Sequence, residues 1–406
     1  MSTPPVETPA VVKLVTRDFT RDPYPALRRI REERAATPVD SAGIRMWIVT
    51  RYEDARRLLA DPDICKDVPA NQDAILRASV LRPEKLRGVP LALRRHMLDR
   101  DEPDHTRLRS LVSAYFTGTA VQAMRAGIET AAAELLDGLP FGQPIDLVDR
   151  FCRPLARSVV AKLLGIAPDD PTPFPEWVNN LLTSLDKNRL NSSAASLVEY
   201  IANLLRRKAA EPADDITSAL ATALAAGELT EVEASASVQL LMNGGLEPLN
   251  GIANAVHALL HNPRQLAATI ADLGLVSNCI DETLRYESPF RMLTPRYSRT
   301  PVDLGDVVIP ANEMILISVA AAGRDPARFE RPDEFDLSRN ARAHLGFGRG
   351  VHRCLGAHLG HLEMHAALTT LLSRAPGIRL AAPDKEVEWL PGIFMRRLRE
   401  LSVVLA

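Results

Sequence analysis

The sequence has few cysteines and no long apolar segment, and both absences narrow the class of protein. The four cysteines are Cys65, Cys152, Cys279 and Cys354, and no two of them form a CxxC pair. With no apolar secretory segment at the N-terminus, a disulfide framework is not expected. No run approaches the roughly 20 apolar residues that a membrane-spanning helix needs. We therefore expect a cytoplasmic protein in a reducing compartment, with no membrane partner.

Net charge and aromatic content are also low. The formal net charge is −2 at pH 7, whereas a nucleic-acid-binding protein normally carries a strongly basic face. No nucleic-acid partner is therefore expected. Aromatic residues make up 5% of the 406 residues, so that a binding pocket would be lined mainly by aliphatic side chains. The hydrophobic fraction of 46% and the charged fraction of 25% are typical of a globular protein with a large core.

Helical periodicity dominates the chain. Residues 1–13 are rich in Pro and Thr and are expected to form a flexible arm, followed by one mainly α domain at 14–406. Helices are predicted at 23–33 and 52–60, from 101 onward, successively across 120–226, at 230–261 and around 281–286. A strand at 46–50 and a hairpin pattern at 302–310 predict a small sheet.

Two segments without periodicity stand out. Residues 67–95 contain three prolines and scattered basic residues, and a loop of this length inside a compact domain is usually functional. We interpret it as a candidate substrate loop. Residues 186–193 are polar and rich in asparagine between two helical patterns, which favours a mobile lid loop.

A glycine-rich loop delivers one cysteine to the start of an apolar, helix-forming run. Gly346, Gly348 and Gly350 alternate ahead of Cys354, and the run extends over 355–372. A thiolate there would be stabilised by the positive end of the helix and by unpaired backbone N–H groups. A lone cysteine in such a turn could instead be a buried structural residue. A dinucleotide-binding loop is disfavoured because the glycines do not have G-x-G-x-x-G spacing.

The pattern Phe347-x-x-Gly350-x-x-x-Cys354-x-Gly356 resembles the haem-thiolate signature of the cytochrome P450 family. The resemblance extends from residue 23 to residue 401. It implies a mainly α fold with a small β-rich corner. It also implies a haem b cofactor whose iron is ligated by Cys354. Phe347, Gly348 and Gly356 would contact this haem.

Four basic or imidazole side chains match haem-propionate ligands in the resemblance. His105 and Arg109 are four residues apart on one helix face, and two such donors can converge on a carboxylate. On the sequence alone, the spacing favours a solvated surface pair, and the resemblance reverses this interpretation. Arg296 and His352 are implied in the same way, although Arg296 in isolation would be an ordinary exposed arginine.

The middle of the predicted 230–261 helix contains residues that disfavour a helix. Gly244 and Gly245 weaken it, and Pro248 removes a backbone donor. Two helices meeting at a kink would explain this without any functional role. In the resembling family this position lies over the iron, and Pro248 stands where a threonine is usual. Glu247 with ordered water, Asn243, Asn250 or a substrate hydroxyl would then deliver protons. The catalytic candidates are Asn243, Gly244, Gly245, Glu247 and Pro248.

Further residues are assigned by resemblance to structure or to substrate binding. Glu282 and Arg285 are three residues apart and could form an ordinary surface pair. The resemblance implies a buried network with Arg339 that supports the cysteine loop. The candidate substrate-pocket residues, with core packing as the alternative, are Leu246, Leu293, Ile393 and Phe394.

The resemblance implies a monomeric haem monooxygenase of the soluble bacterial type, acting in secondary metabolism. It would hydroxylate, demethylate or cross-link a small organic or peptide-like molecule. Because no flavin domain is appended, electrons would come from a ferredoxin and its reductase, docking near Arg107, Arg349 and Arg353. Two alternatives remain open. One is an enzyme that uses hydrogen peroxide, which the missing threonine favours. The other is a haem-binding sensor or carrier without turnover.

Overall fold

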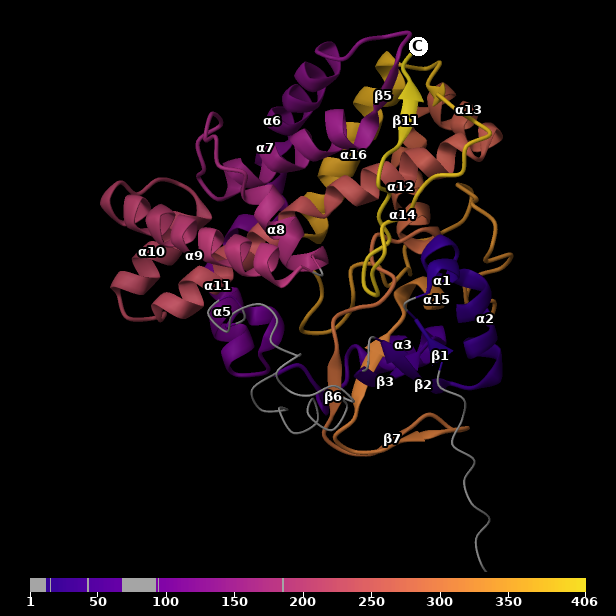
Figure 1. Cartoon of the computed structure of the whole chain (residues 1–406), viewed down its shortest axis with the longest axis horizontal. Helices are drawn as coiled ribbons and strands as arrows, with labels where there is room; N and C mark the ends of the chain where they lie inside the picture. Colours follow the sequence, from indigo (N-terminus) through magenta and orange to yellow (C-terminus); the bar gives the residue numbers. More distant parts are fainter. Residues whose placement is uncertain (1–11, 15, 42–43, 68–92, 94, 185) are drawn as a thin grey trace, which may run out of the picture.

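The computed structural model describes residues 12–14, 16–41, 44–67, 93, 95–184 and 186–406 (Figure 1). The predicted arm falls mainly on residues 1–11 and the predicted substrate loop mainly on 68–92, and both ranges lie outside the described residues. Within the predicted arm, residues 12–13 form the first strand.

Most of the described chain is helical, and its short strands gather in small sheets. The helices are α1 (Arg17–Arg21), α2 (Tyr24–Glu33), α3 (Tyr52–Leu58), α5 (Asp104–Ser113), α6 (Gly118–Asp137), α7 (Arg153–Leu163), α8 (Phe174–Thr183), α9 (Lys187–Ala210), α10 (Ile216–Ala225), α11 (Glu231–Leu246), α12 (Pro248–Leu260), α13 (Pro263–Ala271), α14 (Val276–Tyr286), α15 (Val319–Gly323) and α16 (Ala357–Arg374). The short helical turns are η4 (Met97–Asp99), η5 (Ala114–Phe116), η6 (Val148–Cys152) and η7 (Leu273–Leu275). The strands are β1 (Val12–Lys13), β2 (Ala36–Ser41), β3 (Ile44–Val49), β4 (Ile64–Cys65), β5 (Pro144–Asp146), β6 (Arg296–Ser298), β7 (Val302–Asp303), β8 (Val308–Ile309), β9 (Met314–Ile317), β10 (Arg379–Leu380) and β11 (Ser402–Val404).

The largest sheet has the strand order β1-β2-β3-β9-β6-β4, so it joins the N-terminal strands to strands more than 200 residues later. β2 and β3 are antiparallel, with Pro38 opposite Trp47, whereas β3 and β9 are parallel. β10, β11 and β5 form a second sheet, and β7 pairs with β8 as the predicted hairpin. In Figure 1 the large sheet lies beside α1, α2 and α3, at the opposite end of the molecule from α6, α7 and α16. The predicted mainly α fold with a small β-rich part is confirmed.

Alternation of side chains along the strands explains how the large sheet buries both faces. Met314 and Leu316 of β9 belong to one hydrophobic cluster, and Ile315 and Ile317 belong to another. Successive side chains on a strand point to opposite faces, so one short strand contributes to two cores. A third and larger cluster lies among the helices, where α16 packs against α6 and α12.

The prediction of a lid loop at 186–193 is wrong, because these residues form the N-cap and the first turns of helix α9. The side chain of Asp186 caps the helix by accepting a hydrogen bond from the backbone N–H of Asn188 at 2.9 Å. Such a cap satisfies backbone donors that a helix start otherwise leaves unpaired. The polar residues lie on the exposed side of the first turns, and Ser193 and Ala194 are buried on the other side.

The long helix predicted at 230–261 is two helices, α11 and α12. Thr230 starts α11 with the predicted capping box, accepting from the N–H of Glu233 at 3.2 Å while the Glu233 carboxylate accepts from the N–H of Thr230 at 2.9 Å. α11 ends at Leu246, and Pro248 is the first residue of α12. Proline is favoured at a first helical position because its missing N–H would be unpaired there anyway. Glu247 is therefore the junction residue between the two helices.

None of the helices in the described ranges is both long enough and apolar enough to cross a bilayer.

Candidate active site

A cavity of about 300 Å³ lies between the α11/α12 junction on one side and the cysteine loop with the start of α16 on the other. Its wall is mainly aliphatic, with Val159, Leu163, Leu240 and Leu241 among the residues that line it. This agrees with the low aromatic content of the sequence. Many ligand sites combine such an apolar wall with a few convergent polar groups.

The cysteine loop brings Cys354 to the cavity. The N–H of Cys354 donates to the carbonyl of Phe347 at 2.8 Å, which closes the loop on itself. Gly350 has a φ of +74°, and a Cβ there would lie 2.5 Å from the carbonyl oxygen of Leu59. Only glycine meets both conditions. Of the four cysteines, Cys354 alone lines the cavity, and the other three are buried elsewhere.

Helix α16 begins at Ala357, with Gly356 as its N-cap, so Cys354 lies just before the helix and not on its first turn. Cys354 is exposed to the cavity that it lines. Desolvation by the surrounding protein raises the pKa of its thiol, while a hydrogen bond from the N–H of Gly356 and the charges of Arg109 and Arg353 act in the opposite direction. The loop therefore supplies partial compensation for a thiolate.

His105 and His352 lie together at one end of the cavity, with ring centroids 4.4 Å apart. Nδ1 of His105 donates to the Glu102 carboxylate at 3.1 Å. Nε2 of His105 is buried and has no hydrogen-bond partner among the described residues. Arg109, one turn further along α5, also lines the cavity and donates to the carbonyl of Arg353 at 2.9 Å. The predicted His105 and Arg109 pair thus contacts both the cavity and the cysteine loop.

Arg296 enters the same region from β6 and is 5% exposed. Its Nε has no partner in the described part of the chain. Sequence reasoning missed a neighbouring cation, Lys66, which follows β4, is 2% exposed and donates to the hydroxyl of Thr294. Burial and the nearby Arg296 lower the pKa of Lys66 to about 7. No local motif marks Lys66, because the pairing of β4 with β6 alone brings it close to Arg296.

We call Lys66, His105, Arg109, Arg296 and His352 the cationic end of the cavity. Two carboxylates are found among the described lining residues. Glu247 lies at the α11/α12 junction, and Glu363 lies on α16. Burial and the positive charges of Lys66, Arg296, His105 and Arg109 lower the pKa of His352 to about 2. Buried like charges repel one another strongly, so this end of the cavity fits a group that carries negative charge.

The α11/α12 junction forms the opposite wall. A Cβ on Gly245 would lie 2.0 Å from Cγ2 of Val160, so α11 approaches α7 as closely as glycine allows. A Cβ on Gly244 would meet no atom within 4 Å. Glu247 lines the cavity, and its carboxylate accepts a hydrogen bond from Asn250 at 2.8 Å. Burial raises the pKa of Glu247 to about 7, although Arg397 and Asn250 favour its charged form.

The structure places the other predicted residues in several regions. Phe347, Gly348, Gly356, Pro248 and Leu293 line the cavity. Leu246 lines a second, smaller cavity on the other side of the junction. Ile393 and Phe394 pack against the core of the large sheet, beside Met292. Asn243 is not among the lining residues, and its Oδ1 is buried without a hydrogen-bond partner in the described ranges.

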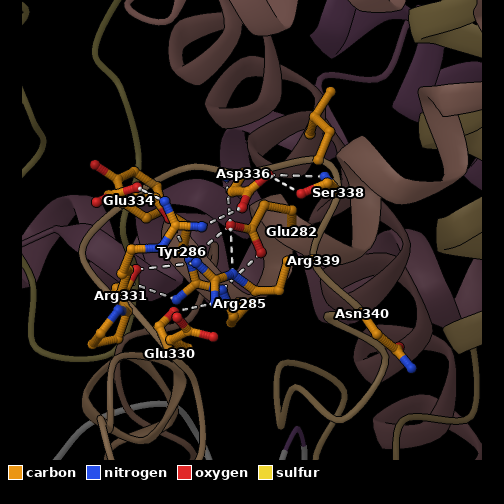
Figure 2. A network of polar contacts seen from close by, with 12 residues as sticks. Glu282, Arg285, Tyr286, Glu330, Arg331, Glu334, Asp336, Ser338, Arg339 and Asn340 are labelled. Atoms are coloured by element: carbon orange, nitrogen blue, oxygen red, sulfur yellow. Dashed lines mark hydrogen bonds and ion pairs between the residues drawn. The ribbon is translucent and has the colours of Figure 1, made fainter.

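Glu282, Arg285 and Arg339 form a buried network between α14 and the segment 330–339 (Figure 2). Arg285 donates to both carboxylate oxygens of Glu282, and Arg339 donates to Oε1 of Glu282 at 3.3 Å. The N–H of Asp336 also donates to Oε1 of Glu282, at 2.8 Å. The network ties α14 to residues 330–339, the segment that leads into the cysteine loop.

Comparison with known proteins identifies the family. The family model described as Cytochrome P450 matches residues 171–375. A relative from Saccharopolyspora erythraea, cytochrome P450 107B1, is 39% identical, with 95% of each chain covered. The chain belongs to the cytochrome P450 family. A second relative of this P450 is the cytochrome P450 monooxygenase PikC of Streptomyces venezuelae, 35% identical over 95% of this chain and 92% of its own.

A solved structure leads to the same conclusion about the fold. The tirandamycin C-bound P450 monooxygenase TamI superimposes on this P450 with a TM-score of 0.91 and is 34% identical. The match covers 97% of this chain and 100% of TamI. This P450 is therefore a monooxygenase of the bacterial type.

Family membership implies a haem whose iron is ligated by a cysteine thiolate. The residues of the cavity fit such a group on three observations. Cys354 is the one cysteine that reaches the cavity. The cationic end contains buried nitrogens on His105 and Arg296 that lack a hydrogen-bond partner among described residues, as propionate carboxylates require. Gly348 and Gly356, which have no side chain, line the cavity beside Cys354.

Proposed function

We propose that this P450 hydroxylates a large, mainly aliphatic product of secondary metabolism, using haem b held by Cys354 and electrons delivered by a ferredoxin. The observation that carries the proposal is the arrangement of one aliphatic cavity between Cys354 and Glu247, with the cationic end at its side. A thiolate, an anion-binding end and a proton donor are the groups that oxygen activation by a haem enzyme requires.

Different residues would bind the iron, the propionates and the ring of the haem. Cys354 would ligate the iron, because the thiolate is the ligand that favours cleavage of the O–O bond. His105, Arg109, Arg296 and His352 would hold the propionates, and we add Lys66 to this set. Charge-assisted hydrogen bonds from these groups to carboxylates are about twice as strong as neutral ones. Phe347, Gly348 and Gly356 would form the surface on which the ring lies.

When bound, the haem supplies the activation of dioxygen, in which two electrons and two protons yield one hydroxyl oxygen on the product and one water. The chain must deliver those protons without the threonine that usually follows the acid. Glu247 can be protonated near neutral pH, because burial raises its pKa to about 7. A general acid works best with a pKa near the operating pH. Glu247 therefore provides the protons, directly or through one water.

The proposed substrate class rests on the wall of the cavity and on the relatives. The wall is mainly aliphatic, so it favours a saturated carbon skeleton over a stacked aromatic one. One relative is 6-deoxyerythronolide B hydroxylase of S. erythraea, 34% identical over 97% of this chain and 99% of its own. Another relative, PksS of Bacillus subtilis, is 33% identical and is named a polyketide biosynthesis cytochrome P450, which supports a polyketide as the substrate class.

The proposed docking site for the ferredoxin is the outer face of the cysteine loop. Arg349, Val351 and Arg353 are exposed there, and Val351 has 57% of its surface exposed. Arg107 contributes less than predicted, since Glu233 and Asp104 bind its guanidinium at 2.5 and 3.0 Å. An acidic partner would be steered by the two exposed arginines of the loop, Arg349 and Arg353.

Reconstitution tests this proposal. The purified haem protein is mixed with a ferredoxin, its reductase and NADPH, and polyketide macrolactones are screened by mass spectrometry for a gain of one oxygen atom. Oxygenation that depends on the ferredoxin supports the proposal. Equal oxygenation by hydrogen peroxide alone would favour the peroxide-using alternative. A reduced protein that binds carbon monoxide but oxidises nothing in the panel would favour a sensor or carrier.

A further inference from the structure

A second cavity lies on the far side of the α11/α12 junction from the first. Its volume is about 60 Å³, several times the roughly 10–15 Å³ that one water molecule needs. Residues of α7, α8 and the C-terminal segment surround it, including Arg153, Asn179 and Arg397. Its lining combines aliphatic side chains with six polar or charged ones, a larger polar share than in the first cavity, and it has room for a few water molecules.

Glu247 is the one described residue that lines both cavities. This position follows from the helix break, since Glu247 lies between the end of α11 and Pro248 of α12. Asn250, which donates to the Glu247 carboxylate, lines the second cavity and not the first. The hydrogen bond thus holds the carboxylate on the side of the second cavity.

Arg397, from the C-terminal segment, contributes a positive charge to the lining of the second cavity. It is 8% exposed, and its guanidinium donates to Asn179 at 3.2 Å. Its Nε is buried and has no hydrogen-bond partner among the described residues. A buried arginine with an unpaired N–H lacks a nearby acceptor, which ordered water in the second cavity would provide.

The charges around Glu247 come from several elements. Arg397 and Arg399 belong to the C-terminal segment, Arg153 to α7, and Glu363 of α16 lines the first cavity. Helix α8 contributes the neutral Asn179. Arg153 and Arg399 are exposed and pair with Asp149 and Glu388, so they mark the outer rim. The polar path therefore runs from the exposed rim through Arg397 to Glu247.

We propose that the second cavity is a water-filled port through which Glu247 takes up protons from solvent, and that Arg397 is the positioning residue that holds the Glu247 carboxylate at this port. The inference rests on the proposed function, because it assigns the source of the protons that oxygenation consumes. Arg397 does not touch the reacting atoms. It acts through Glu247, by attracting the deprotonated carboxylate to the port after each proton has been given up.

The proline at position 248 explains why a separate route for protons would be needed. Proline has no hydroxyl that could share the proton transfer, so the acid alone must pass on each proton that comes from solvent. A carboxylate that lines both cavities can accept a proton on one side and donate it on the other without a change in the fold. The same break that removes the usual hydroxyl places the acid at the port.

A titration of the Glu247 carboxyl group tests the positioning role without turnover. Infrared difference spectra of the haem protein, with Glu247→Gln as the blank, follow the carboxyl band against pH. Removing a nearby positive charge disfavours the carboxylate, so Arg397→Gln should shift the midpoint upward by on the order of one pH unit. Arg397→Lys should keep it near the wild-type value. Arg379→Gln, an exposed arginine of β10, is the matched control and should shift nothing.

Product yield tests the port. Val178 is 2% exposed and lines the second cavity, so Val178→Phe fills the space without changing charge. Both Arg397→Gln and Val178→Phe should lower the ratio of product to NADPH several-fold and raise hydrogen peroxide by a matching amount, with melting temperatures recorded as a check on folding. An unshifted carboxyl midpoint in Arg397→Gln, or an unchanged ratio in Val178→Phe, would overturn the inference. A wild-type protein that oxygenates nothing would instead overturn the proposed function.

Discussion

The guanidinium of Arg285 donates two parallel hydrogen bonds to the carboxylate of Glu282, from Nε to Oε2 and from Nη2 to Oε1, each 2.7 Å long. Both side chains are fully buried. The remaining donors of Arg285 reach the carbonyl oxygens of Gly323 and Pro332 at 2.7 Å and of Glu334 at 2.9 Å. Every charged atom of the pair is therefore satisfied, and the pair fixes the segment that leads to the cysteine loop.

Glu282→Gln should lower the free energy of unfolding by about 3–5 kcal/mol, because it leaves a buried guanidinium without its counter-ion. Urea unfolding followed by circular dichroism measures this loss. Arg29→Gln is the control, because Arg29 and Glu33 form an exposed ion pair on α2 whose removal should change stability by less than about 1 kcal/mol. Equal losses in the two variants would contradict the structural role of the buried pair.

Interactions between residues close in sequence could be predicted from local geometry, whereas contacts between distant segments came only from the family resemblance, as for Arg339 with Glu282, or were missed. The capping box of Thr230 and the Glu282 and Arg285 pair each span three residues, so local geometry determines them. No local sequence pattern marked Lys66 or Arg397 as a site residue, because each reaches its cavity only when segments distant in the sequence fold together. The 186–193 helix start was missed because its polar composition outweighed the capping role of Asp186.

The two adjacent glycines at the helix junction should respond differently to alanine. Gly245→Ala places a Cβ 2.0 Å from Val160, so α11 must move away from α7. Overpacking of this kind typically destabilises by about 1–3 kcal/mol. Gly244→Ala meets no atom within 4 Å and should be neutral or stabilising, because alanine favours the helix by up to about 1 kcal/mol. Thermal melts of the two variants compare the sites, and a larger loss in Gly244→Ala would contradict the packing described.

Lys66 should make the stability of the haem-free protein depend on pH. Its pKa is lowered to about 7 in the folded state, below the ordinary lysine value of 10.5. Between these values the unfolded chain binds more protons, so the free energy of unfolding should rise with pH, by at most about 1.4 kcal/mol per pH unit. Below pH 7 the full penalty of the buried charge is present.

Lys66→Met separates this effect from other titrations. The variant should be more stable than the wild type at pH 7, and its stability should change less between pH 7 and 9.5, as measured by urea unfolding of haem-free protein. The same variant should bind haem more weakly, because a cation that would hold a propionate is lost. Parallel stability profiles for variant and wild type would contradict the burial of a charged Lys66.

Cys354→Ser should abolish thiolate ligation, since of the four cysteines only Cys354 lines the cavity. The carbon monoxide complex of the reduced protein then loses the red-shifted Soret band that a thiolate ligand produces. Cys152→Ser is the control, because Cys152 is buried among core residues and burial raises the pKa of its thiol. A red-shifted band in Cys354→Ser would require a different ligand.

Glu247→Gln should slow product formation by on the order of 100-fold, the usual contribution of a general acid, while Glu231→Gln on the exposed first turn of α11 should not. The wild-type rate should fall above pH 7, because the carboxyl group then loses the proton it donates. Pro248→Thr adds a hydroxyl next to the acid, so Glu247→Gln should lose less activity in that background. Rates and peroxide release across the double-mutant cycle measure this coupling. Strict additivity would mean that the hydroxyl and the carboxyl group deliver protons independently, and the junction would then have no shared role in proton delivery.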